Sequence, residues 1–260
     1  RSAKDLEIAL DIMAGPIERE ARGWQLNLPE SRKSSLKDFK VAIWSNDELA
    51  PVSKEIEKKC EEVGANLTSA GVNVSYTAKP GHDFLKAEIN YQLLLQSVMQ
   101  SGMSEEEYKK IEEIASTLEP NDLSVDALLA RGTVLSHRNW IRQNYAREQT
   151  KISWGNFFNE WDILVCPQLA TTAIEHDHRK FSERSIMVDN QEQRYFQQIF
   201  WPGLAVNAHL PSTVFPTGLA RDGMPVGLQA IGGAYEDKTT IKFAELYEEE
   251  FKAFVVPNLD

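Results

Sequence analysis

The run from Pro216 to Gly233, PTGLARDGMPVGLQAIGG, constrains the fold more than any other stretch of this chain. Its glycines and prolines lie at fixed offsets between two short apolar segments, and this pattern predicts a strand, a tight turn and a second strand. We expect the strands near residues 213–215 and 226–231. Glycines and prolines at such positions mainly shape the backbone, so this run is evidence for a fold and not for a reaction.

The first third of the chain predicts one helix and then a β–α–β unit. Apolar residues from Leu6 to Met13 recur at helical spacing behind a Ser2–Asp5 capping box, and Gly15-Pro16 ends that helix. Residues 17–36 form a polar connector. Strands are expected at 39–44 and 72–76 around a helix at 52–67, and a parallel pairing of the two strands requires a right-handed crossover.

The remaining segments complete an α/β pattern. Residues 83–161 are mostly helical, with breaks near Gly102 and Pro120, and residues 162–167 form a short buried strand. We expect a loop at 170–190, a helix at 193–201 that Pro202-Gly203 ends, and a last helix at 237–254. The predicted fold class is α/β, with a mixed β-sheet flanked by helices.

Charge and cysteine content narrow the classes of partner. The chain has 39 acidic and 28 basic residues, a formal charge of −11, which disfavours nucleic acid as a partner. No apolar run approaches the roughly 20 residues of a membrane-spanning helix, so we expect no membrane partner. Cys60 and Cys166 lie in segments that the pattern predicts to be buried. Free thiols in a reducing compartment are favoured over the alternative, a disulfide.

Several segments, in unbroken order, resemble the amidase signature family. They begin with the opening helix and its Gly15-Pro16 end, and continue with the strand that ends at Pro167. The segment Leu210–Gly218 and the terminal pattern follow, the latter formed by Gly223, Pro225, Gly227, Gln229, Gly232 and Asp237. Ser136–Trp140, Glu175–His178 and Trp201–Ala205 further resemble a bacterial branch of small-amide amidases. The resemblance extends from the first residue to the last helix.

The resemblance implies hydrolysis of a carboxylic acid amide to acid and ammonia, without metal or organic cofactor. The family performs it with a Ser-Ser-Lys set and a glycine-rich loop in its N-terminal half. Such a loop needs small residues, because its backbone N–H groups approach the developing oxyanion. This chain contains no Gly-Ser dipeptide, and its Gly232-Gly233 pair precedes Ala234. We therefore assign no catalytic residue to this chain and expect it to be inactive alone.

Residues 1–260 are accordingly expected to be the C-terminal part of a single amidase domain. The chain begins at Arg1, one residue before a helix cap, which suggests that an upstream segment has been lost, cleaved or left out. We expect the missing N-terminal half as a partner, present as a second chain or a nicked segment, and a small-molecule amide as the substrate. The expected location is the cytoplasm.

The resemblance also places a short segment beside the acyl pocket. Trp201 ends the predicted helix at Pro202-Gly203, and Gln198 lies one turn earlier. We predict substrate-binding roles for Trp201 and Gln198 and, with less support, for Tyr195. Many family members have glycine before the Leu210-Pro211 pair, where this chain has His209.

Other interpretations stay open. Ser34-Ser35 lies beside Lys33 and Lys37, but without glycine it indicates a solvated loop. His176 and His178 could bind a metal from one side of a strand, which would make a metal-dependent hydrolase, although two histidines in a polar loop commonly just form hydrogen bonds. His137 indicates a structural or surface residue. A non-catalytic amidase-like binding module is the alternative to an enzyme. The acidic charge disfavours the activity of those relatives that amidate misacylated transfer RNA.

Overall fold

The computed structural model describes residues 2–180, 183–252 and 254–256. It divides into two compact units. The first comprises residues 1–79, 155–205 and 209–260, and the second comprises residues 80–154 and 206–208. Each unit is described by itself.

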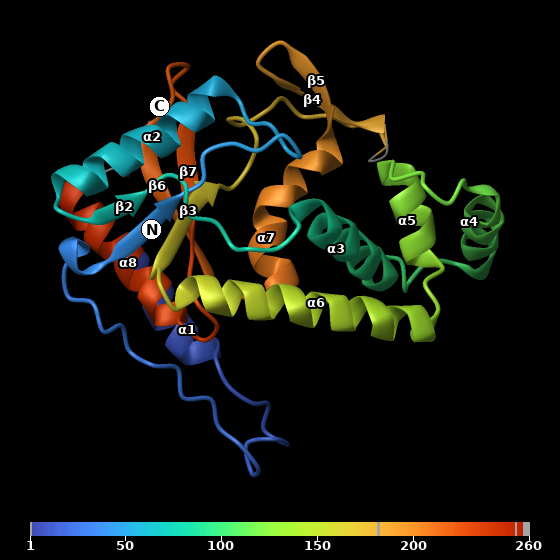
Figure 1. Cartoon of the computed structure of the whole chain (residues 1–260), viewed down its shortest axis with the longest axis horizontal. Helices are drawn as coiled ribbons and strands as arrows, with labels where there is room; N and C mark the ends of the chain where they lie inside the picture. The colour runs from blue at the N-terminus through green and yellow to red at the C-terminus, as the bar shows by residue number, and fades with distance from the viewer. Residues whose placement is uncertain (1, 181–182, 253, 257–260) are drawn as a thin grey trace. The chain divides into compact units, whose positions relative to one another are not determined.

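The first unit is built on a five-stranded sheet with the order β2-β1-β3-β7-β6 (Figure 1). The strands are β1 (Lys40–Ile43), β2 (Asn73–Ser75), β3 (Ile163–Pro167), β6 (Ser212–Leu219) and β7 (Pro225–Ile231). β1 is parallel to both β2 and β3, whereas β7 is antiparallel to both β3 and β6. The predicted mixed sheet of an α/β fold is confirmed, and so is the strand–turn–strand at its end.

The helices α1 (Ala3–Met13), α2 (Lys54–Ser69) and α8 (Asp237–Phe251) belong to the first unit, together with the first part of a further helix described below. Ser2 and Asp5 form the predicted capping box of α1. The apolar stripe expected on α2 is buried, including Ile56 and Leu67. α2 and α8 lie on the same face of the sheet, since the Asn66 side chain of α2 donates a 3.3 Å hydrogen bond to the Tyr247 hydroxyl of α8. A short 3₁₀ turn, η1 (Leu36–Asp38), leads into β1.

The aromatic centre of the first unit lies between α8 and the sheet. Phe243 of α8 is fully buried. Its ring meets Phe39 at 5.4 Å and Phe215 of β6 at 5.6 Å between centroids, both edge to face. Tyr247 packs against the same Phe215 ring at 5.0 Å. Edge-to-face contacts of this kind add to the stabilisation from burial, so these rings couple α8 to both halves of the sheet.

Both cysteines are buried free thiols, as the sequence indicated. Burial raises the pKa of Cys60 and of Cys166, and the charge of Cys60 raises the pKa of Cys166 further. A thiol whose pKa is raised by burial is a poor nucleophile, because the thiolate is the reactive form. Neither cysteine is therefore a candidate for covalent chemistry.

The structure corrects the prediction for residues 170–201. The expected loop contains β4 (Ser185–Val188), which pairs with β5 (Gln191–Arg194) in a separate antiparallel hairpin. The expected helix 193–201 is wrong: a 3₁₀ turn, η3 (Tyr195–Ile199), precedes α7 (Phe200–Ala208), which continues through Pro202-Gly203. Pro202 is the third residue of α7. A helix tolerates proline in its first turn, because the N–H groups there have no acceptor within the helix. The last helix ends at Phe251 and not at residue 254.

The second unit is helical, as predicted for residues 83–161. It contains α3 (Phe84–Met99), α4 (Glu105–Thr117), α5 (Val125–Thr133) and most of α6 (His137–Phe158). α3 and α5 touch at Gly132, where an added Cβ would lie 2.6 Å from the Cβ of Gln96 and 3.0 Å from the Leu93 carbonyl oxygen. Only glycine allows this close approach of the two helices.

His82 gives the second unit a predicted dependence on pH. Its ring lies 4.4 Å from Phe84 between centroids and 3.2 Å from the Ser153 hydroxyl through Nδ1, and burial lowers its pKa below 6.5. A lowered histidine pKa means that the unfolded chain takes up the proton first as the pH falls. The stability contributed by neutral His82 is thus complete above pH 6.5 and is lost as the pH falls through its folded pKa.

We expect the free energy of unfolding to fall between pH 7.5 and pH 5, with a slope from this group of at most about 1.4 kcal/mol per pH unit. Denaturant melts of the wild type and of His82→Gln over that range measure it. Glutamine cannot titrate, so the difference between the two proteins isolates the imidazole from the many carboxylates. Parallel pH profiles would contradict the assignment.

Candidate functional site

The three predicted pocket residues lie in consecutive turns of one segment. Tyr195 begins η3 and is partly buried, Gln198 is 8% exposed, and Trp201 is completely buried in the first turn of α7. The Trp201 indole packs edge to face against Trp44 at 5.4 Å and against Phe200 at 5.3 Å. The structure thus brings the three residues together on one segment. Their contact with a substrate stays a prediction.

The same segment holds the chain between β1 and α2 through three side-chain donors, which we call the clasp: Gln193, Gln197 and Trp201. Gln193 donates to the Pro51 carbonyl at 3.1 Å, Gln197 to the Leu49 carbonyl at 3.0 Å, and the Trp201 indole to the Ala50 carbonyl at 3.0 Å. Three consecutive peptide carbonyls are therefore satisfied by side chains. The regular spacing of four residues between the donors is visible in the sequence, but no sequence pattern identifies the carbonyls that accept from them.

Gln229 of β7 joins the segment to the sheet. Its amide nitrogen donates to the Pro167 carbonyl at 2.9 Å and to the Trp201 carbonyl at 2.8 Å, and its oxygen accepts from the Ser212 hydroxyl at 3.0 Å. The side chain is 1% exposed. Both amide hydrogens have acceptors and the oxygen has a donor, so this polar group is fully satisfied in the core. Sequence reasoning counted Gln229 only as part of the family pattern and missed this role.

His209 occupies a backbone conformation that favours glycine. Its φ is +54°, directly after α7, and the following Leu210 N–H donates to the Ala205 carbonyl at 3.0 Å. A left-handed residue at this point ends a helix, and glycine adopts it without a steric penalty. The glycine that many family members have before the Leu210-Pro211 pair is thus explained by the left-handed backbone conformation at this position.

We expect His209→Gly to be more stable than His209→Ala by about 1 kcal/mol, because both variants remove the imidazole while only alanine keeps the Cβ strain. Chemical denaturation of the two variants beside the wild type measures the difference. Equal midpoints would show that the left-handed conformation carries no strain here.

Two alternative chemistries find no support in the described residues. The Ser34 and Ser35 hydroxyls both bond to the Asp38 carboxylate, and the neighbouring Lys33 pairs with Asp162 at 2.9 Å. That arrangement is the start of η1 and not a nucleophile with its base. His176 and His178 have ring centroids 6.2 Å apart. Across the described part of the chain, no group of three histidine, cysteine or acidic side chains is placed to hold a metal ion.

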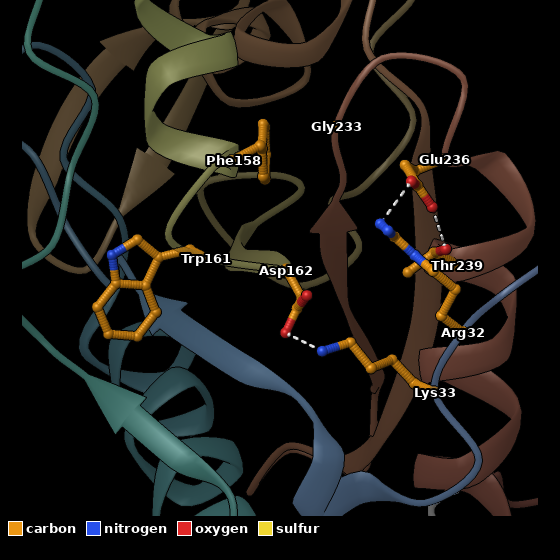
Figure 2. A pocket seen from close by; sticks show the side chains of 8 residues that line it. All are labelled: Arg32, Lys33, Phe158, Trp161, Asp162, Gly233, Glu236 and Thr239. Carbon is orange, nitrogen blue, oxygen red and sulfur yellow. Dashed lines mark hydrogen bonds and ion pairs between the residues drawn. The ribbon is translucent and has the colours of Figure 1, made fainter.

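A small polar pocket lies beside the start of β3 (Figure 2). Arg32 pairs with Glu236 at 3.3 Å and Lys33 with Asp162, so the connector after α1 makes one ion pair at the start of α8 and one beside the start of β3. The volume is about 50 Å³, far below the roughly 300 Å³ or more of a typical small-molecule site. With its charges paired, this pocket is a structural junction and not a candidate substrate site.

An apolar groove runs along the edge of the sheet that β6 forms, between α1 and β6. Two hollows of about 210 and 410 Å³ form it. The α1 side contributes Ser2, Ala3, Leu6, Ala9, Leu10 and Met13, the β6 side contributes residues 211–216, and α8 residues contribute the remainder. Leu6 is 46% exposed, Met13 76% and Val214 47%. We call this feature the edge groove.

Within the described residues, no helix is both long enough and apolar enough to cross a membrane.

Comparison with known proteins gives one family. A family model described as Amidase matches residues 1–241. A glutamyl-tRNA(Gln) amidotransferase subunit of Clostridium botulinum (strain Okra / Type B1) is 23% identical over 267 residues, which cover 96% of this chain and 53% of that protein. An acylamidase of Rhodococcus erythropolis is 25% identical over 263 residues, which cover 95% of this chain and 50% of that protein.

Solved structures agree with the sequence relatives. A bacterial aryl acylamidase of the amidase signature family superposes with a TM-score of 0.67 at 16% identity, covering 96% of this chain and 52% of that one. The chain spans about half the length of the curated relatives it matches. Since the family model matches most of its residues, the chain belongs to the amidase signature family.

Proposed function

We propose that this chain is the C-terminal part of an amidase that hydrolyses a linear carboxylic acid amide to acid and ammonia. The nucleophilic serine, the relay serine and the lysine lie on polypeptide outside residues 1–260. That polypeptide is the partner of this chain, as a separate chain or a nicked segment, and together they form a single amidase domain. The complete enzyme needs no metal or organic cofactor and works in the cytoplasm.

The observation that supports this proposal most is the match of nearly all of this chain to about half of each relative. A chain that contains only half of a family fold, and no Gly-Ser dipeptide, lacks the small-residue loop that an oxyanion site requires. Ser34-Ser35 does not supply a serine–lysine pair among the described residues, because the Ser35 hydroxyl bonds to Asp38 and Lys33 pairs with Asp162. The chemistry is therefore assigned to the complementary part.

The segment of Tyr195, Gln198 and Trp201 supplies one wall of the acyl pocket in this proposal. Trp201 is immobilised by its indole bond to Ala50 and by Gln229 on its carbonyl. A fixed wall suits catalysis, because an amide carbonyl has to stay aligned with the nucleophile and the oxyanion donors. Amidation of transfer RNA, the activity named for some relatives, is disfavoured by the formal charge of −11.

Ammonia release tests the proposal. Residues 1–260 alone should release no ammonia above the uncatalysed background from a panel of small aliphatic and aromatic amides. The complete protein, purified with the complementary polypeptide, should turn over at least one of them. Mass spectrometry of the same preparation should find that polypeptide, with a Gly-Ser-rich sequence.

The outcomes separate the enzyme from its rival. Hydrolysis by residues 1–260 alone would place the reactive groups in this chain and refute their assignment to the complementary polypeptide. A complete preparation that binds amides without releasing ammonia would support the non-catalytic binding module. Activity that disappears with a chelator and returns with zinc would support the metal-dependent alternative at His176 and His178.

A further inference from the structure

Two asparagine side chains are buried on one side of α3 in the second unit. Asn90 of α3 is 4% exposed and Asn207, in the last turn of α7, is 5% exposed. Both belong to the second unit, which comprises residues 80–154 and 206–208. A buried amide needs partners for its oxygen as well as for its nitrogen, because burial removes the solvent that would otherwise bond to both. The hydrogen bonds of these two side chains therefore show what else this region has to bind.

Hydrogen bonds place the two amides at neighbouring turns of α3. The Nδ2 atom of Asn90 donates to the backbone carbonyl of Gln143 at 2.8 Å and to its side-chain oxygen at 2.9 Å, which joins α3 to α6. The Nδ2 atom of Asn207 donates to the Ala87 carbonyl at 3.3 Å, which joins α7 to α3. Residues 87 and 90 are three apart, so they lie on the same side of the helix.

The Arg147 side chain of α6 belongs to the same region. His82, just before α3, bonds to Ser153 near the end of α6. Asn90, farther along α3, bonds to Gln143, which is earlier in α6, so the two helices run antiparallel. One turn onward along α6, from Gln143 to Arg147, therefore corresponds to one turn back along α3. Arg147 is thus placed at the turn of α3 to which α7 donates.

Three buried atoms here have no hydrogen-bond partner among the described residues: Asn90 Oδ1, Asn207 Oδ1 and Arg147 Nε. We call these three residues the amide–guanidinium cluster. In the rest of the described chain, Gln193 Oε1 of the first unit is the one further side-chain atom of this kind. Exchanging the oxygen and nitrogen of either asparagine does not help, because it would set an oxygen against the oxygens that now accept from Nδ2. The guanidinium is held in place, since its Nη2 atom donates to Asn144.

The chemistry of the three atoms selects their partner. Two amide oxygens need donors, and one guanidinium N–H needs an acceptor. A cation would suit the oxygens but is repelled by the charge of Arg147, and an anion would suit the N–H but is repelled by the oxygens. A water molecule can donate two hydrogen bonds and accept two. One water can therefore donate to both asparagines and accept from Arg147, which is the usual number of about three bonds for a buried water.

We propose that the amide–guanidinium cluster is a binding site for one buried water, which links α3, α6 and the last turn of α7 within the second unit. The water satisfies polar groups that three helices bring together, and the burial of both asparagines keeps it from exchanging freely with bulk solvent. The proposal is independent of the reaction proposed for the complete protein, because none of the three residues has a part in that reaction.

NMR of the arginine Nε–H groups in the wild-type chain tests the proposal. We expect the Arg147 Hε proton to show a cross-peak with water that has opposite signs in NOESY and ROESY spectra. Opposite signs identify a water that stays bound during molecular tumbling, whereas proton exchange with bulk solvent gives the same sign in both spectra. Arg142, which is exposed on the same helix, is the internal reference and should show exchange only.

Leucine variants give the second readout, because leucine keeps the approximate size of asparagine and removes its polar atoms. Asn90→Leu and Asn207→Leu should each abolish the Arg147 cross-peak. Each should also lower the number of long-lived waters, measured by oxygen-17 magnetic relaxation dispersion, by one. The double variant should likewise lose one water and not two, because both asparagines bind the same molecule. Asn139→Leu, the same substitution at an exposed position of α6, is the matched control and should change neither readout.

Four outcomes would overturn the proposal. If the wild-type Arg147 Hε only exchanges protons with bulk solvent, no water is bound there, whether or not the variants fold. A scalar coupling across a hydrogen bond, from Arg147 Nε to the side-chain carbonyl carbon of either asparagine, would show a direct bond in place of the water. Loss of two waters from the double variant would show two separate sites. Displacement of the cross-peak by added acetamide would identify a carboxamide as the ligand.

Discussion

Replacing Gln229 by glutamate is expected to destabilise the protein by about 3–5 kcal/mol at pH 8. In the wild type the amide nitrogen donates to the Pro167 and Trp201 carbonyls. A carboxylate at the same place would put a charged oxygen against two carbonyl oxygens, in a site that is 1% exposed. Both the lost hydrogen bonds and the buried charge act in the same direction.

The pH dependence of this variant gives an independent check. Burial beside two acceptors raises the folded pKa of the new carboxyl group above its unfolded value, so protonation favours the folded state. The deficit relative to the wild type should therefore shrink as the pH falls from 8 toward 5. Urea denaturation at both pH values measures it. Gln191→Glu, at an exposed position of β5, is the matched control and should change stability by no more than about 0.5 kcal/mol. A deficit below about 1 kcal/mol for Gln229→Glu would mean that Gln229 does not join β7 to α7 as described.

Truncation of Phe243 to alanine is expected to cost about 3–5 kcal/mol. The ring is fully buried and lies within 5.6 Å, between centroids, of both Phe39 and Phe215. Removing it opens a cavity between α8 and the sheet and breaks the aromatic contacts that connect Phe39, which precedes β1, to β6. Denaturant unfolding followed by tryptophan fluorescence measures the loss.

Two further variants test whether the loss of stability comes from core packing or from the removal of any aromatic side chain. Phe243→Leu retains most of the apolar volume and should cost less than about 1.5 kcal/mol. Tyr145→Ala removes an aromatic ring that is 68% exposed on α6 and should change little. If Phe243→Ala and Tyr145→Ala had the same effect, the aromatic centre assigned to the first unit would be wrong.

Local patterns predicted the elements well where neighbours in sequence decide the conformation. The turn between β6 and β7 formed at Gly223, whose φ of +82° favours glycine over any residue with a Cβ. The cap of α1 at Ser2 formed for the same local reason, since the side chain satisfies an N–H three residues away. The prediction was wrong at Pro202. Proline ends a helix when it lies in the helix interior, but it is accepted in the first turn, where Pro202 lies.

The candidate site was predictable only in part. The sequence located Tyr195, Gln198 and Trp201 as one segment, and the structure keeps them together. The sequence could not reveal that Gln193, Gln197 and Trp201 donate to carbonyls 142 to 151 positions earlier, since no spacing rule relates a donor to a distant backbone acceptor. Gln229 was recognised as part of a pattern, yet its three partners come from three different elements.

By itself the sequence determined the α/β class, the family, and the lack of a Gly-Ser loop, because periodicity, turn residues and motif order are properties of neighbouring positions. Only the tertiary structure decided which strand lies at the end of the sheet and why His209 occupies a glycine-like conformation. These features depend on contacts between segments far apart in the chain, and such contacts are set by the packing of the whole unit and not by local propensity.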